Sequence, residues 1–129
     1  MTKKEKELLE RVKELIAKWQ PLLSLENWTI HCHLEELREG AALSILCSQE
    51  GYLDAAVNVS PQTVKSIETL EMLEHCVVHE LVHVLIHPMA KILTRELAMD
   101  GALYQELSES EESICDNLAG ILGRLHAST

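Results

Sequence analysis

Two histidines and a glutamate lie together in one apolar segment of the chain. His79, Glu80 and His83 form the pattern H-E-x-x-H within residues 77–85. Positions four apart on a helix lie nearly above one another, so His79 and His83 can direct two imidazoles at one metal ion. Glu80 lies beside them and can take a proton from a water bound to that metal. Neutral imidazole is a good zinc ligand, and a catalytic zinc has three protein ligands and one water. The pattern predicts one zinc ion (Zn2+) per chain.

The residues around this pattern predict a buried helix. Apolar side chains occupy nearly all of its circumference: Val77, Val78, Leu81, Val82, Val84 and Leu85. Polar groups inside a buried helix need partners. A metal ion meets that need, and a pair of hydrogen-bonded histidines without metal is the structural alternative.

The histidine pair belongs to a longer ladder on a helix expected from Thr69 to His87. The ladder has a step of four residues and comprises His75, His79, His83 and His87. Each step drifts by about 40° around the helix, so all four cannot meet one ion. We expect the outer two near the helix ends, facing solvent or groups around the site, and Pro88 to end or kink the helix.

The third ligand is expected on the last helix. Ser108 to Glu111 fits the capping box S-x-x-E, which gives Glu111 a structural role at the helix start. Glu112 and Asp116 lie four apart on one face, and two acids on the inner side of an apolar helix are costly unless paired or metal-bound. We predict Glu112 as the ligand and Asp116 as acceptor of a ligand histidine's other ring N–H. Glu111 is the alternative ligand, and an ordinary solvated face is the structural alternative for the pair. This helix is expected to be buried through Ile114, Leu118, Ile121, Leu122 and Leu125.

The order of the predicted elements indicates an α+β fold in a single domain, residues 1–129. We expect an N-terminal helix, a small three-stranded antiparallel sheet, the central H-E-x-x-H helix and a C-terminal helix that carries the third ligand. The sequence places the first helix at Lys3–Gln20, the strands at Trp28–Glu35, Ala42–Gln49 and Tyr52–Val59, and a further helical stretch at Met89–Met99, broken by Asp100-Gly101.

Strict alternation in the first strand separates an inner from an outer face. Cys32 falls on the inner face and His31 and His33 on the outer one, so this tract predicts two surface histidines rather than a metal site. In the connecting stretch, Tyr104 can either pack or reach a substrate.

Composition narrows the function classes. The formal net charge of -10 argues against nucleic acid or an anionic membrane surface as the main partner. The hydrophobic fraction is 47%, no apolar run approaches a membrane span, and the first residues lack a signal sequence. None of the four cysteines forms C-x-x-C, which indicates reduced thiols in a soluble, cytoplasmic protein.

The motif His79-Glu80-Leu81-Val82-His83, followed by Glu112-Ser113-Ile114-Cys115-Asp116, resembles the gluzincin pattern H-E-x-x-H then E-x-x-x-D. The short length and the strand before the helix are similar to the minigluzincins and related small, often phage-encoded, metallopeptidases. This resemblance implies that a zinc-activated water attacks a peptide carbonyl with Glu80 as general base. It also implies that the third strand, through Ala55, Ala56, Val57 and Asn58, is the cleft edge that pairs with an extended peptide. The metzincin pattern fails because the position of its third histidine is Met89.

Three function classes follow. The first is a small zinc-dependent peptidase that acts on a peptide or protein substrate. The second is a latent or non-catalytic zinc-stabilised domain that binds a protein partner. The third is a helix-rich interaction module without metal. The sequence leaves the substrate, the cleavage preference and the oligomeric state open.

Overall fold

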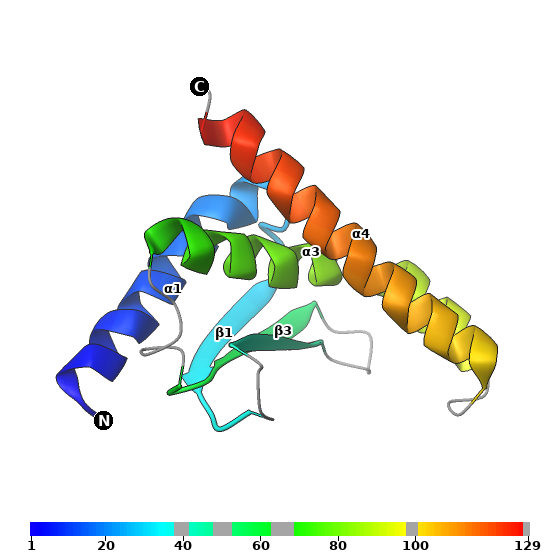
Figure 1. Cartoon of the computed structure of the whole chain (residues 1–129), viewed down its shortest axis with the longest axis horizontal. Helices are drawn as coiled ribbons and strands as arrows, with labels where there is room; N and C mark the ends of the chain where they lie inside the picture. The colour runs from blue at the N-terminus through cyan, green and yellow to red at the C-terminus, as the bar shows by residue number, and fades with distance from the viewer. Residues whose placement is uncertain (38–41, 48–52, 63–68, 98–100, 128–129) are drawn as a thin grey trace.

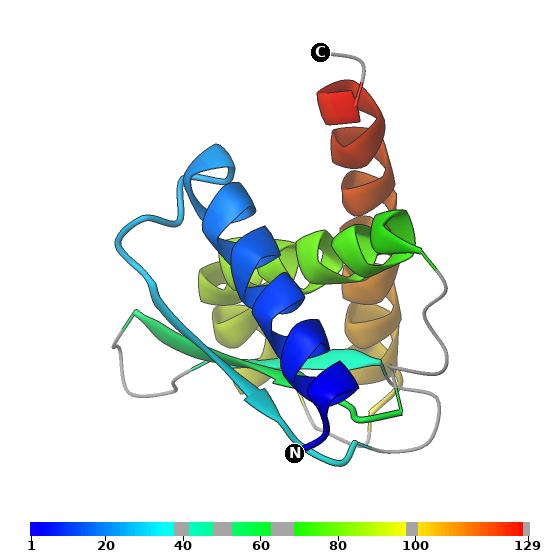
Figure 2. The same cartoon turned by 90° about the vertical axis from the view of Figure 1, so that its left-hand side faces the viewer.

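A computed structural model of the protein describes residues 1–37, 42–47, 53–62, 69–97 and 101–127. The fold is α+β, as predicted: the described helices lie on one face of a three-stranded sheet (Figures 1 and 2). The elements are α1 (Lys3–Leu22), β1 (Thr29–Leu34), β2 (Leu43–Cys47), β3 (Asp54–Val59), α3 (Leu70–Arg95) and α4 (Ala102–Ala127).

Helix α1 follows the predicted amphipathic pattern. The side chain of Thr2 caps it by accepting a hydrogen bond from the backbone N–H of Glu5 at 3.1 Å. The sequence predicts a buried stripe of Leu8, Val12, Leu15, Ile16 and Trp19, and all of these except the half-buried Leu8 are buried. The helix runs to Leu22 rather than ending at Gln20, and Pro21 lies in its last turn. The chain then reverses at Ser24, which has a φ of 56°.

A partly exposed acid ties α1 to α3. Glu74 accepts hydrogen bonds from the Lys18 ammonium and from the Trp19 indole N–H, each at 2.7 Å. Burial alone would raise the pKa of Glu74, but these two donors outweigh it and lower the pKa. The pair of contacts fixes the start of α3 against the end of α1.

The strands present the predicted faces. Along β1 and β3 the more buried positions alternate with more exposed ones. Ala55, Val57 and Val59 of β3 point into the core, and His31 and His33 of β1 lie on the exposed outer face. Their rings stack 6.2 Å apart. The dipeptide Glu50-Gly51 is typical of a hairpin turn, but it lies outside the described residues.

The predicted antiparallel sheet is wrong in one of its two strand pairings. The order is β1-β3-β2, with β1 parallel and β2 antiparallel to β3, so the sheet is mixed. Short connections predict that neighbours in sequence pair with one another. Here the connection over residues 35–42 is long enough to carry the chain past the position that β3 later occupies. The third strand is therefore central, and β2 forms an edge of the described sheet.

Helix α3 is longer than predicted and contains Pro88. The predicted end at His87 is wrong, because the Met89–Met99 helical stretch continues the same helix as far as Arg95. Its buried residues lie between Leu73 and Val84, in the core, whereas Leu85, Met89 and Ile92 are exposed. By length and composition alone, α3 could cross a membrane, a test that the core helix of a soluble protein also passes.

Helix α4 begins earlier than predicted. It starts at Ala102, and the Gln105 N–H already bonds the Gly101 carbonyl at 3.2 Å. Ser108 therefore lies inside the helix, and the predicted capping box is wrong. The helix begins directly after the break that precedes Ala102. Leu103 and Leu107 have high helix propensity, and they extend the helical pattern through Ser108. Glu111 consequently has no capping role.

Candidate metal centre

The inner pair of the histidine ladder converges as predicted. His79 and His83 lie one turn apart on α3, and their Nε2 atoms are 3.3 Å apart. Their side chains are 16% and 10% exposed, so they sit at the surface of the core rather than in open solvent. Five of the six predicted apolar neighbours are buried, and only Leu85 is exposed. The buried neighbours fix the helix face that carries the pair.

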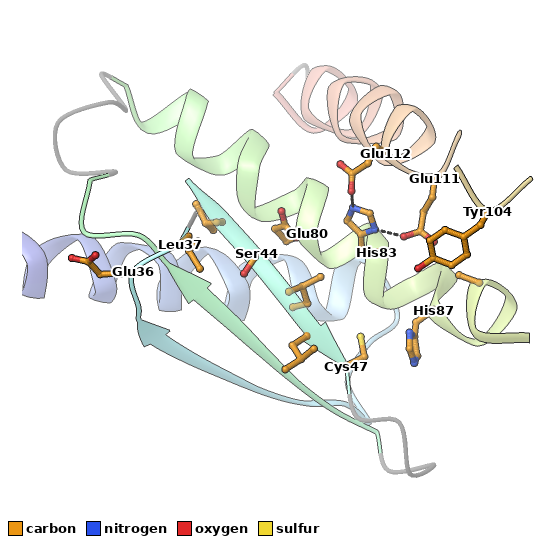
Figure 3. A pocket seen from close by; sticks show the side chains of 14 residues that line it. Glu36, Leu37, Ser44, Cys47, Glu80, His83, His87, Tyr104, Glu111 and Glu112 are labelled. Carbon is orange, nitrogen blue, oxygen red and sulfur yellow. Dashed lines mark hydrogen bonds and ion pairs between the residues drawn. The ribbon is translucent and has the colours of Figure 1, made fainter. Parts of the chain in front are cut away.

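Helix α4 brings Glu112 to these two nitrogens. The Glu112 carboxylate lies 3.0 Å from His79 Nε2 through one oxygen and 2.9 Å from His83 Nε2 through the other. Figure 3 shows the Glu112 side chain reaching from α4 to His83. The three ligand atoms lie within 4.8 Å of one another, and the group could hold a metal ion.

The donor set fits zinc in type and spacing. Zinc takes imidazole and carboxylate ligands at about 2.0–2.2 Å in a tetrahedral arrangement, which separates neighbouring ligand atoms by about 3.3–3.5 Å. The 3.3 Å between the two Nε2 atoms matches that separation. Half-buried nitrogens this close to a carboxylate form a site that a divalent cation would complete.

Glu80 borders the same space. It lines the cleft together with His83 and Glu112 (Figure 3). Burial, and after it the nearby negative charge of Glu112, raises the pKa of Glu80 to about 8. A cation bound by Glu112 would oppose this rise. The side chain bonds neither histidine in the described structure, which leaves its carboxylate available to another group.

Asp116 lies beside the predicted ligand but bonds a different histidine. Its Oδ1 is 2.8 Å from Nε2 of His75 and 3.6 Å from Nδ1 of His79. The hydrogen bond from His75 is the main cause of the lowered pKa of Asp116. The predicted contact to a ligand imidazole is thus longer than a hydrogen bond, and His75, expected near the helix end, holds Asp116 next to His79.

Glu111 takes the role that the sequence assigned to Asp116. It accepts a hydrogen bond from Nδ1 of His83 at 2.7 Å (Figure 3). This bond directs Nε2 of His83 toward Glu112 and fixes the ring's tautomer. The sequence does not predict this contact, because Ser108 resembles a helix start and thereby gives Glu111 a capping role. The helical pattern of Leu103 and Leu107 ahead of Ser108 is the signal that could have revealed it.

A cleft of about 900 Å³ opens in front of these residues. One wall is the whole of β2, and the other comes from α3 and α4. Tyr104 and His87 also line it, and Figure 3 shows both on the side of Glu111. Four glutamates and no lysine or arginine are among its described lining residues: Glu36, Glu80, Glu111 and Glu112.

The third strand does not border this cleft. Ala55 and Val57 are buried in the core, and β3 is paired on both sides, through Ala56 and Asn58 among others. The predicted peptide-pairing edge is therefore wrong, because β3 inserts between the other two strands. Among the described strands, β2 is the edge beside the histidines.

The end of α4 lies away from the cleft. The helix continues to Ala127, and the His126 ring packs 5.1 Å from the Trp19 ring of α1. None of the described residues after Glu112 lines the cleft. The described part of the C-terminus leaves the site open.

Comparison with known proteins gives no relative on which to base a function. No protein-family model, no curated protein and no solved structure matches the chain. The function has to be argued from the chemistry of the site.

Proposed function

We propose that this protein is a zinc-dependent peptidase of the gluzincin type. The observation that carries the proposal is the convergence of His79, His83 and Glu112, with Glu80 beside them in an open cleft. A structural site would take a fourth protein ligand and exclude water. Here two of the three proposed ligands, His83 and Glu112, line an open cleft, as a catalytic site requires.

Each residue has a distinct task in this proposal. A zinc ion held by His79, His83 and Glu112 would supply Lewis acidity, which acidifies water and polarises a carbonyl. Glu80 is not needed as a ligand, so its carboxylate can accept a proton and return it to a leaving amine. Glu111 and the His75–Asp116 pair hold the ligands in place.

The edge of β2 suggests how a substrate would bind. An extended peptide can add to an open sheet edge through main-chain hydrogen bonds, with side-chain pockets giving specificity. Residues Leu43 to Cys47 line the cleft along its length, facing Glu80 and His83. A peptide paired with β2 would pass directly in front of the proposed zinc site. We therefore assign the substrate strand to β2 instead of β3.

The test is cleavage of an unfolded protein. Zinc-loaded protein, prepared without an affinity tag, is incubated with fluorescein-labelled casein and fragment release is followed. We expect cleavage that ortho-phenanthroline abolishes, that its non-chelating meta isomer leaves intact, and that added zinc restores. A zinc-loaded protein that cleaves nothing would contradict the proposal and favour the non-catalytic zinc-stabilised domain. Cleavage that survives chelation would assign the activity to another protein.

A further inference from the structure

Helix α4 carries an exposed apolar stripe that the fold does not bury. The sequence predicts that Ile114, Ile121 and Leu125 are buried, but they are 48%, 43% and 61% exposed. The helix packs on the core through Cys115 and Ala119 instead, with Leu118 and Leu122 beside them. Near the other end, Leu103 is 64% exposed. Contiguous apolar surface of this kind marks an interaction site.

The stripe has a regular and symmetric spacing. Its members are separated by four, seven, seven and four residues: Leu103, Leu107, Ile114, Ile121 and Leu125. Leu107 is half-buried, and the other four are exposed. Steps of four and seven keep side chains on one face of a helix, and a seven-residue repeat is the spacing with which one helix packs along another. The sequence of steps reads the same in both directions from Ile114. Such a stripe can pack against the same stripe of a second copy that runs antiparallel to it.

The charges along α4 have the matching arrangement. Its first half carries Glu106 and Glu109, and its last turns carry Arg124. When two copies are aligned antiparallel on Ile114, position 124 of one copy lies level with position 104 of the other, so that Arg124 is within reach of Glu106. A parallel alignment would instead place the acidic halves together, which is unfavourable. The spacing permits both orientations, and the charges favour the antiparallel one.

We propose that two copies of this chain associate through α4, packed antiparallel about a two-fold axis at Ile114. A two-fold interface uses the same patch on both copies, which this symmetric stripe provides. Ile114 lies two residues after Glu112, about 200° around the helix, so the interface faces away from the metal ligands. The cleft stays open in the dimer. The proposal is independent of the peptidase function.

The first test is the molar mass in solution, measured by light scattering and sedimentation from micromolar to millimolar concentration. We expect the wild type to reach twice the chain mass of 14.5 kDa. Ile114→Glu should weaken association by about 30-fold or more, because it places a charge at the centre of the interface. Its circular dichroism and zinc content should not change, since Ile114 is half exposed. The matched control is Leu22→Glu, an exposed leucine at the end of α1 that should leave the dimer intact.

A charge exchange tests the antiparallel orientation. Arg124→Glu should weaken the dimer, and Glu106→Arg in the same chain should restore it. A wild type that stays monomeric at every concentration would overturn the proposal. So would a dimer that Ile114→Glu leaves intact, or one that the paired exchange fails to restore. A monomer that instead sediments with lipid vesicles would assign the stripe to a membrane surface and likewise overturn it.

Discussion

Glu80→Gln is expected to abolish peptidase activity while the protein keeps its metal and its fold. The amide has nearly the same shape but cannot accept the proton that the reaction releases. General base catalysis contributes about 10²–10⁴-fold in rate, so activity should fall at least by this factor. The zinc content should be unchanged, because Glu80 is not among the converging ligands. The measurement compares initial rates of peptide cleavage at equal zinc occupancy.

The matched control for this substitution lies on the same helix. Glu71→Gln removes the same charge from an exposed position in the first turn of α3. It should leave the cleavage rate and the zinc content as they are. A zinc-loaded Glu80→Gln protein that retains full activity would show that Glu80 is not the base.

Glu112→Ala is expected to lower zinc affinity by orders of magnitude. Glu112 supplies the only carboxylate in the converging group, and its two oxygens lie 3.0 Å and 2.9 Å from the two imidazole nitrogens. Its removal leaves two neutral ligands and no charge to balance the cation. The affinity is measured by competition with a chromogenic chelator at fixed pH.

Two neighbouring glutamates provide graded controls for this loss. Glu111→Ala removes the acceptor that orients His83 and should cost about 10–100-fold in zinc affinity. Glu109→Ala changes an exposed residue on the same helix and should have no effect. If Glu111→Ala lost more affinity than Glu112→Ala, the roles of ligand and orienting residue would have to be exchanged.

The local part of the site could be predicted from the sequence because it depends on helix periodicity alone. His79 and His83 converge since any helix places residues four apart on one face. The choice of Glu112 over Glu111 also agrees with the described geometry, although the capping box that favoured this choice is wrong. The close pairing of Glu112 with both histidines depends on how α4 crosses α3, which helix periodicity does not determine.

The strand order could not be predicted because it is not a local property. Alternation correctly separated the inner from the outer face of each strand, as the buried Val57 and the exposed His31 illustrate. The alternation of apolar and polar residues along a strand, however, does not depend on which strand pairs with it. Only the long connection between β1 and β2 hinted that β3 could lie between them. Because β3 was expected to be the sheet edge, the sequence analysis assigned the substrate strand to β3. The structure has β2 at that edge instead.

Helix ends and helix faces were misjudged for related reasons. Pro88 and Ser108 are signals that usually end or start a helix, yet both lie inside one here. Surrounding residues with high helix propensity outweigh such signals. The apolar stripe of α4 was predicted to be buried because an apolar face looks the same in sequence whether it packs on the core or on another molecule. Its exposure at Ile114 is what the structure adds.

The most direct test of the account is the zinc content of the protein, purified without an affinity tag and reconstituted with one equivalent of metal. We predict one zinc per chain by mass spectrometry of the ion. We also predict a fall in melting temperature on chelation, because a ligand that binds only the folded state stabilises it. Far less than one zinc per chain, together with a melting temperature that chelation leaves unchanged, would contradict the account.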